Sequence, residues 1–214
     1  MSSHQTAKTE GVGATNARGA LLKQERALQT RQTVLAAAAE MFAEHGYPAV
    51  TVMHVAERAE MTKGAVYFHF ANKEALAQAV VEEFYRRLPV IVAPALGKKG
   101  LDPLRAVAEV MNRTALAFRD DVVIQAGARL QIERSYIGAE LPPPYTAFQA
   151  MIEELLTRAE VEGALQCRVS PEGYARVLVS AFFGAQHISW VQCDRNDIED
   201  RVREIVEAVL PDRA

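Results

Sequence analysis

Cysteine and long apolar runs are both scarce in this sequence. Only Cys167 and Cys193 occur among 214 residues, too few for a disulfide framework. We interpret both as small buried or surface thiols in a reducing cytoplasm. No run approaches the roughly 20 apolar residues that a membrane span needs, and the first 22 residues lack the apolar segment of a secretory signal. We therefore expect a cytoplasmic protein with no membrane partner.

Patterns typical of metal sites and of enzymes are missing as well. The sequence contains no serine elbow, phosphate loop or dinucleotide-binding glycine pattern. Ser189 lies near His187, but as a helical neighbour it makes no catalytic triad. The five histidines show no metal-ligand spacing with the cysteines. We therefore expect no metal, no cofactor and no enzymatic activity.

The residues that are abundant favour helices. Half of the chain is hydrophobic, which is enough for a core. Aromatic residues are few at 7%, alanine is frequent, and no stretch alternates like a strand with turn signals. The sequence thus predicts an all-α protein.

Charge is distributed unevenly. Residues 1–31 carry five Lys and Arg against two Asp and Glu, whereas residues 80–214 carry 16 against 20. A basic N-terminal segment and an acidic C-terminal part are consistent with an anionic partner that binds at the N-terminal end. A solvated basic tail explains the same pattern equally well.

Helical periodicity divides the chain into three parts. Residues 1–22 have few large apolar side chains, so we predict a flexible arm there. Residues 23–79 form three short helices and the start of a long fourth one, which Pro89 is expected to kink or end. Thr51, Thr62 and Asn72 are the predicted N-caps of the second, third and fourth helices. Residues 80–214 form the helical remainder. Its predicted helices span 103–119, 122–137, 145–162, 171–192 and 198–210.

The three short helices match a helix-turn-helix unit, in which the third helix enters the DNA major groove by its N-terminal end. Lys63 can reach a phosphate or a guanine edge there, and Tyr67 and His69 can touch phosphate or a thymine methyl. The remaining DNA-contact candidates lie at the third helix start, at the two flanking helix starts and in the arm: Thr62, Gly64 and Ala65; Thr51 and Lys73; Lys23 and Arg26. The alternative is an ordinary three-helix packing unit.

Residues 51–70, TVMHVAERAEMTKGAVYFHF, resemble the DNA-binding domain of TetR-family repressors. Gly46-Tyr47 before them and Asn72-Lys73-Glu74-Ala75-Leu76 after them extend the resemblance. The family usually has glycine in the turn, where this chain has Glu60. A non-glycine residue at positive φ costs on the order of 1 kcal/mol, so we expect either a relaxed turn or a slightly less stable domain.

A narrower resemblance extends further along the chain. Residues 23–31, 62–70 and 125–130 (QAGARL) resemble the autoregulator receptors of Streptomyces, which include γ-butyrolactone receptors and their furan- and butenolide-sensing relatives. The segments LPPPY at 141–145 and AFFGAQH at 181–187 look most like the methylenomycin-furan type. Many of these receptors carry tryptophan where this chain has Phe148.

A sensor of this kind needs a pocket, and polar residues that interrupt apolar helix faces are its candidates. Tyr85, Gln131 and Tyr145 stand at such positions, and the resemblance strengthens their assignment to a lactone carbonyl or a carboxylate. Arg129 must be paired if it is buried. The other candidate pocket residues are Leu88, Phe148, Phe183 and His187. For each one, an ordinary core or interface role remains the alternative.

The last two predicted helices carry apolar stripes that face either the internal core or a second subunit. The resemblance implies a homodimer on a palindromic DNA operator, released by a small diffusible furan, γ-butyrolactone or butenolide, that controls antibiotic or other secondary-metabolite genes. Two alternatives stay open. One is a multidrug-sensing regulator of an efflux gene, and the other is a helical interaction module without a DNA role.

Overall fold

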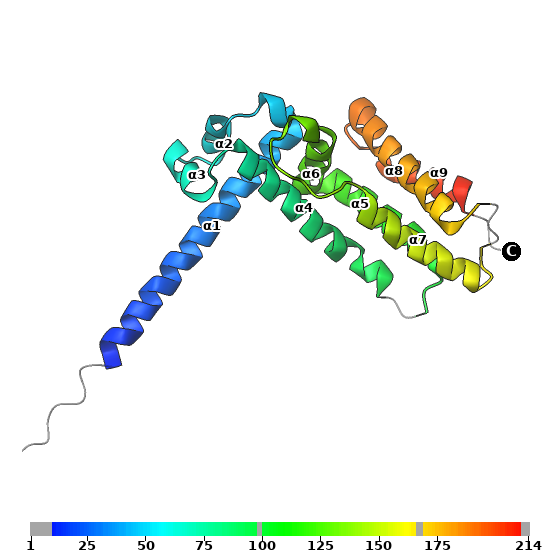
Figure 1. Cartoon of the computed structure of the whole chain (residues 1–214), viewed down its shortest axis with the longest axis horizontal. Helices are drawn as coiled ribbons and strands as arrows, with labels where there is room; N and C mark the ends of the chain where they lie inside the picture. The colour runs from blue at the N-terminus through cyan, green and yellow to red at the C-terminus, as the bar shows by residue number, and fades with distance from the viewer. Residues whose placement is uncertain (1–9, 98–99, 166–168, 211–214) are drawn as a thin grey trace, which may run out of the picture.

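The computed structural model describes residues 10–97, 100–165 and 169–210, and its regular elements are all helical (Figure 1). No strand occurs in those three ranges, so the predicted all-α fold is confirmed. The elements are α1 (Glu10–Ala49), α2 (Val52–Arg58), α3 (Lys63–His69), α4 (Lys73–Leu96), α5 (Pro103–Asp120), α6 (Val122–Ile132), the 3-10 turn η1 (Arg134–Tyr136), α7 (Thr146–Val161), α8 (Pro171–Cys193) and α9 (Ile198–Val209).

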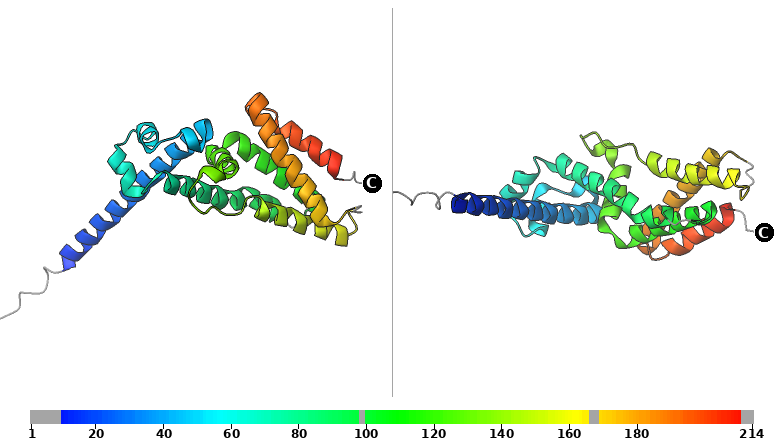
Figure 2. Two further views of the ribbon diagram at one scale, coloured as in Figure 1. Left: turned by 45° about the horizontal axis from the view of Figure 1, so that its top comes forward. Right: turned by 90° about the horizontal axis from the view of Figure 1, so that it is seen from below.

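The first helix is longer than the sequence predicts. It begins at Glu10, so residues 10–22 are helical where we expected a flexible arm, and residues 1–9 lie outside the described part. The extension continues a helix that is already formed from residue 23 onward, and propagation is far easier than nucleation. In both Figure 1 and Figure 2 this end of α1 projects away from the other helices. At its other end α1 breaks at Gly46, which has φ 77°.

Capping side chains start the helices of the helix-turn-helix unit. The Thr51 hydroxyl accepts a hydrogen bond from the His54 backbone N–H, and the Thr62 hydroxyl accepts one from that of Ala65, both at 3.2 Å. Asn72 caps α4 in the same way. These bonds satisfy donors that a helix N-terminus otherwise leaves unpaired. The sequence predicted all three caps.

The turn between α2 and α3 keeps a left-handed residue. Glu60 has φ 54°. Its backbone N–H donates to Glu57 O, and the Met61 N–H donates to Ala56 O at 2.9 Å. This pair of bonds closes a helix in the Schellman manner. The turn therefore does not relax around Glu60, which leaves the domain with a conformational cost of about 1 kcal/mol.

The fourth helix continues past the proline that was expected to kink or end it. Pro89 and Pro94 both lie within α4, which ends at Leu96. Both prolines are exposed, so the backbone groups that they leave without helical partners face water. Further along, α6 ends earlier than predicted and η1 follows it.

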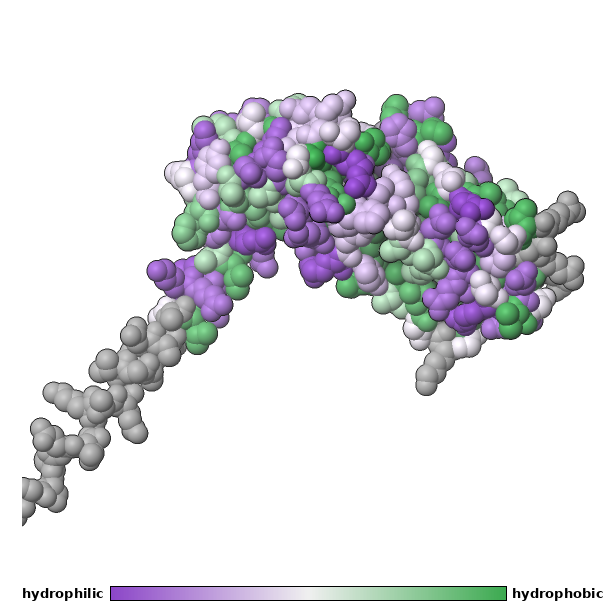
Figure 3. Space-filling model, viewed as in Figure 1, coloured by the Kyte–Doolittle hydropathy of each residue, from purple (hydrophilic) through white to green (hydrophobic). Residues whose placement is uncertain are grey.

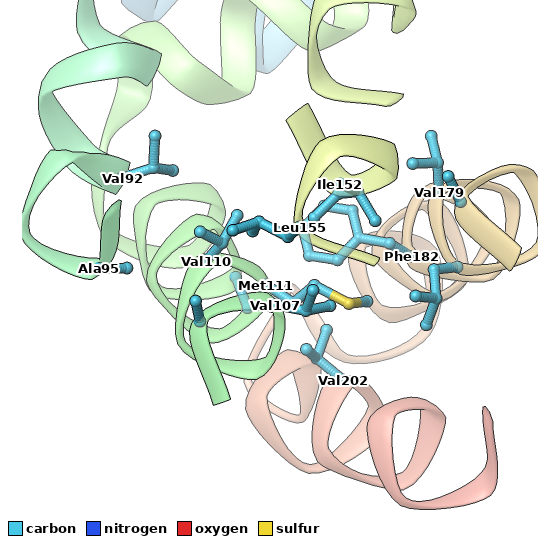
Figure 4. Packing of buried hydrophobic residues seen from close by; sticks show 14 of the residues in the cluster. Val92, Ala95, Val107, Val110, Met111, Ile152, Leu155, Val179, Phe182 and Val202 are labelled. Carbon is cyan, nitrogen blue, oxygen red and sulfur yellow. The ribbon is translucent and has the colours of Figure 1, made fainter. Parts of the chain in front are cut away.

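Two separate hydrophobic cores hold these helices. One joins α1, α2 and α3 to the first half of α4 and to α6, and is built largely from alanine and valine. The other joins α5, α7, α8 and α9 to the second half of α4 and to Ile124 and Ala128 of α6, and it contains several aromatic rings. In Figure 4, Val110 and Met111 of α5, Leu155 of α7 and Phe182 of α8 point toward the centre of this second core. The long helix α4 thus belongs to both cores.

The described ranges contain neither a membrane-spanning helix nor a cluster of side chains suited to a metal ion. No helix there is long and apolar enough to cross a bilayer, and no group of three or more His, Cys, Asp or Glu residues could hold a metal ion. The Cys193 thiol is free and exposed. Cys167 lies outside the described residues.

Candidate functional site

The exposed face of α3 carries most of the predicted DNA contacts. Val66 is fully buried and anchors the helix. Thr62, Lys63 and Gly64 are exposed at its start, and Tyr67 keeps 43% of its surface accessible. Ala65 and His69 are partly buried. The short helix therefore presents its N-terminal end to the surroundings, and the predicted DNA contacts of this end stay a prediction.

Two aromatic contacts order the side chains of this face. The Lys63 Nζ atom lies 5.6 Å from the centre of the Tyr67 ring, close enough for a weak cation–π attraction. The Phe68 ring meets that of His69 edge-on with centres 5.0 Å apart. Phe68 is 80% exposed, and the sequence analysis did not select it. Phe68 directly follows the candidate Tyr67 in the sequence, and this position is the signal that could have identified it.

The flanking candidates occupy different settings. Thr51 is exposed at the start of α2, and Lys23 and Arg26 are exposed on the projecting part of α1. Lys73 is partly buried: its Nζ donates to the Tyr47 carbonyl at 2.9 Å and lies 4.1 Å from the centre of the Tyr47 ring. Lys73 is therefore held against the end of α1.

A cavity of about 460 Å³ lies between α4, α5, α6, α7 and α8. Such a volume lies within the usual range for a small-molecule pocket. Six of the seven predicted ligand residues line it: Tyr85, Leu88, Gln131, Tyr145, Phe148 and Phe183. The other lining residues are Phe84, Pro89, Val92, Ala93, Leu96, Gly97, Thr114, Phe118, Pro144, Ala147 and Met151.

A short chain of hydrogen bonds marks the polar side of the cavity. Gln131 Nε2 donates to the Tyr85 hydroxyl at 3.1 Å, which donates to the Pro143 carbonyl at 3.2 Å. Burial raises the pKa of Tyr85, so this hydroxyl stays protonated. The Gln131 Oε1 atom is buried and has no partner. A buried acceptor without a donor is costly, so this atom favours a ligand that supplies one.

Much of the remaining cavity wall is aromatic. The rings of Tyr145 and Phe183 lie 4.4 Å apart between centres. Burial raises the pKa of Tyr145, whose hydroxyl makes no hydrogen bond within the described part of the chain. Thr114 donates to the Val110 carbonyl at 2.7 Å and can still accept a hydrogen bond. None of the lining residues is charged.

His187 was predicted to line the pocket, but it is not among the lining residues. Its side chain is exposed one helical turn beyond Phe183, and its ring lies 5.8 Å from that of Trp190. Val92, Ala93 and Leu96 were missed because α4 was expected to kink or end at Pro89. Thr114 was missed too, although a lone hydroxyl on the apolar face of an amphipathic helix was its signal.

Comparison with known proteins agrees with these features. Residues 34–80 match the family model described as bacterial regulatory proteins, tetR family. The chain is 31% identical to the A-factor receptor protein of Streptomyces griseus over 89% of its own length and 66% of that receptor. A solved structure on the control of antibiotic production by bacterial hormones is 50% identical, with a TM-score of 0.76, and covers 85% of this chain and 95% of that one. TylP, a TetR regulator from Streptomyces fradiae, is 33% identical with a TM-score of 0.66 and covers 86% of each chain.

Proposed function

The chain belongs to the TetR family of bacterial regulatory proteins, and on this premise we propose that it is a dimeric repressor released from DNA by a small signalling molecule. Family membership also supports the prediction that it is not an enzyme. The observation that carries the proposal is the uncharged cavity beside α4, because the same helix begins next to the DNA-reading α3.

The DNA partner is a palindromic operator. The exposed start of α3 supplies Lys63 for a base edge or a phosphate, and Thr62, Gly64 and Tyr67 lie beside it. Thr51 and the projecting α1, with Lys23 and Arg26, are available for contacts to the DNA backbone. Two such units related by a two-fold axis read two half-sites about one helical turn apart.

The dimer is supported by apolar residues on the outer face of α8. Val177, Ile188 and Val191 are 51%, 44% and 67% exposed. With Ala181 and Gly184 they follow the three- and four-residue spacing of a single helix face. The stripe on α9 contributes to the internal core instead. Of the two helices on which the sequence predicted an apolar stripe, α8 is therefore the one with an exposed apolar face that is available to a second subunit.

The ligand is an alkylated furan carboxylic acid, a γ-butyrolactone or a butenolide. The apolar lining accommodates an alkyl chain, and Tyr85, Gln131 and Tyr145 provide hydrogen-bonding atoms for a ring oxygen, a carbonyl or a hydroxyl. No acidic residue lines the cavity, which argues against the cationic compounds that a multidrug sensor would bind. The regulated genes are those of antibiotic or other secondary-metabolite production. The protein acts on them in the cytoplasm.

Release follows from linkage between the two sites. Ligand bound in the cavity alters the position of the start of α4, and with it the separation of the two α3 helices in the dimer. The ligand must prefer the state that does not bind DNA by the same free energy that it removes from operator affinity.

Fluorescence anisotropy on labelled DNA from the region upstream of this gene tests the proposal. The protein is titrated first, and then lactones, furan carboxylic acids, butenolides and cationic drugs are added at fixed salt. We expect tight, sequence-specific binding and release by one of the three oxygen-ring classes. Binding without sequence preference would contradict the repressor role, and release by the cationic drugs alone would contradict the ligand class.

A further inference from the structure

The end of α1 is held by a side chain of α6. Arg129 Nη1 donates hydrogen bonds to the backbone oxygens of Ala43 and Glu44 at 2.9 and 3.0 Å. These carbonyls precede the break of α1 at Gly46, where a helix end favours a cation. Arg129 Nε also donates to Glu133 Oε1 at 3.0 Å. The Arg129 guanidinium thus connects the end of α1 to Glu133, which directly follows α6.

Glu133 holds the chain on the other side of the break. Its Oε2 atom accepts a hydrogen bond from the Tyr47 backbone N–H at 2.6 Å. A Cβ built on Gly46 would lie 2.5 Å from Glu133 Oε1 and 2.6 Å from Arg129 Nη2. Glycine is therefore needed both for the positive φ and for this close approach. We call Arg129 and Glu133 together the α6 clamp.

The clamp continues toward the DNA-reading helix through Tyr47. This residue is 4% exposed, and its hydroxyl donates to Glu74 Oε1 at 2.9 Å. The Tyr47 backbone carbonyl accepts a hydrogen bond from the Lys73 ammonium group. Lys73 and Glu74 form the start of α4, and three residues separate them from the end of α3 at His69. A movement of the clamp therefore reaches the base of the reading helix through direct contacts.

The clamp also adjoins the cavity. Arg129 and Gln131 stand two residues apart on α6, which places them about 200° apart around the helix, on opposite faces. Gln131 is 4% exposed and lines the cavity. The Arg129 guanidinium lies 5.1 Å from the Trp190 ring of α8. One short helix thus contacts the ligand cavity on one face and the end of α1 on the other.

We propose that Arg129 is the positioning residue that couples the cavity to the DNA-reading helices, an inference that rests on the proposed function. A ligand that displaces Gln131 moves α6 as a unit, because packed helices shift between discrete arrangements rather than bend. The clamp then shifts the Gly46–Tyr47 segment, and with it the start of α4. Without Arg129 the cavity still fills, but the reading helices no longer respond.

The test fills the cavity without knowledge of the natural ligand. Full-length protein with Cys167→Ser, Cys193→Ser and Met151→Cys is treated with hexyl methanethiosulfonate, which leaves a hexyl chain disulfide-bonded at a cavity-lining position. Operator Kd is measured by anisotropy with and without the hexyl group. The ratio of the two values is the coupling factor. Arg129→Met is compared with Arg113→Met, in which the lost arginine also pairs with a glutamate one turn away but lies on α5, away from the clamp.

We expect the hexyl group to weaken operator binding about tenfold or more in the parent and in Arg113→Met, which is within the usual range of coupling. In Arg129→Met the factor should fall below about threefold, while mass spectrometry shows complete labelling. An unchanged factor in Arg129→Met, with only a lower Tm, would reduce Arg129 to a structural role and overturn the proposal. If the parent binds operator but does not respond to the hexyl group, release itself fails, and both this proposal and the proposed ligand response are overturned.

Glu133→Gln provides a second, nearly isosteric variant in case Arg129→Met does not fold. Its amide can keep only one of the two clamp hydrogen bonds, because one carboxylate acceptor is replaced by a donor. We expect a coupling factor between those of the parent and Arg129→Met. Trp190 is the sole tryptophan and lies against Arg129, so its fluorescence is a direct readout. Its emission should change on hexyl labelling in the parent, and the absence of any change would contradict movement at the clamp.

Discussion

The two halves of the molecule bury similar helices with different side chains. The core around the DNA-reading helices relies on alanine and valine, with Phe42, Leu76 and Leu130 as its largest fully buried members. The core of the other half places Phe118 and Phe182 beside a cavity of about 460 Å³. Small side chains allow close helix contacts, whereas large rings leave space between them. The comparison indicates that the DNA-reading unit is closely packed, whereas the other half leaves a cavity in which a ligand can bind.

The surface of the molecule does not reveal this contrast, because hydrophilic and apolar residues are mixed across both halves in Figure 3.

The largest expected effect tests this contrast in packing. Phe42→Ala and Phe118→Ala each remove a fully buried ring and should cost about 3–5 kcal/mol of unfolding free energy. Phe118 already faces the cavity, so its loss should fall at the lower end. Urea unfolding at one fixed protein concentration measures both values, since dimer stability depends on concentration. A greater loss from Phe118→Ala would contradict the contrast.

Next in size is the loss of a DNA contact from the reading unit. Lys63→Ala should weaken operator binding by about 1–3 kcal/mol and lower the salt slope by about 1. Ligand affinity should stay unchanged, because Lys63 lies outside the cavity. Arg203→Ala is the matched control, since Arg203 is an exposed cation on α9. Equal operator affinity for Lys63→Ala and the wild type at matched salt would contradict the predicted contact between α3 and DNA.

An acid titration tests the ion pairs at the middle of α4. Hydrogen bonds from Arg86, and from Arg87 beside it, lower the pKa of Glu83 to about 2 from its ordinary 4.5. Because the folded state has the lower pKa, this stabilisation is complete above pH 4.5 and is lost as the pH falls toward 2. Glu83→Gln should remove about 1 kcal/mol at neutral pH after solvent screening, and much less near pH 2. An equal loss of stability at both pH values would exclude this carboxylate as the cause.

The smallest effects concern the two tyrosines of the cavity. Tyr145→Phe removes a hydroxyl that has no hydrogen bond in the described part of the chain, so folding stability should stay unchanged. Ligand affinity should fall by about 0.5–1.5 kcal/mol if that hydroxyl contacts the ligand. Tyr85→Phe should weaken the ligand similarly but also destabilise the fold, because it breaks the chain from Gln131 to Pro143. Isothermal titration calorimetry and thermal unfolding separate the two. An unchanged response for both variants would place the ligand elsewhere.

The two halves also differ in how well the sequence predicted them. Caps at Thr51, Thr62 and Asn72 are local signals, and each marked a helix start correctly. In the second half, Pro89 was expected to kink or end α4, because a local rule cannot tell that the proline would face water on an exposed side. This single error hid the lining residues that follow it.

The clamp lay beyond local signals for a different reason. Sequence alone predicted that Arg129 would need a partner if buried, but its partners are the carbonyls of Ala43 and Glu44, more than 80 positions away. His187 fits the pattern of α8 that the sequence shows, yet its side chain is exposed and does not line the cavity. Contacts distant in sequence depend on how whole helices pack, and periodicity carries no information on that.

A reciprocal binding cycle tests the central claim most directly. Operator Kd is measured with and without the compound that releases DNA most effectively, and the Kd of that compound is measured with and without saturating operator. If one dimer couples the cavity to α3, the two ratios must be equal. A compound that binds equally well in the presence and absence of operator would contradict release through the cavity.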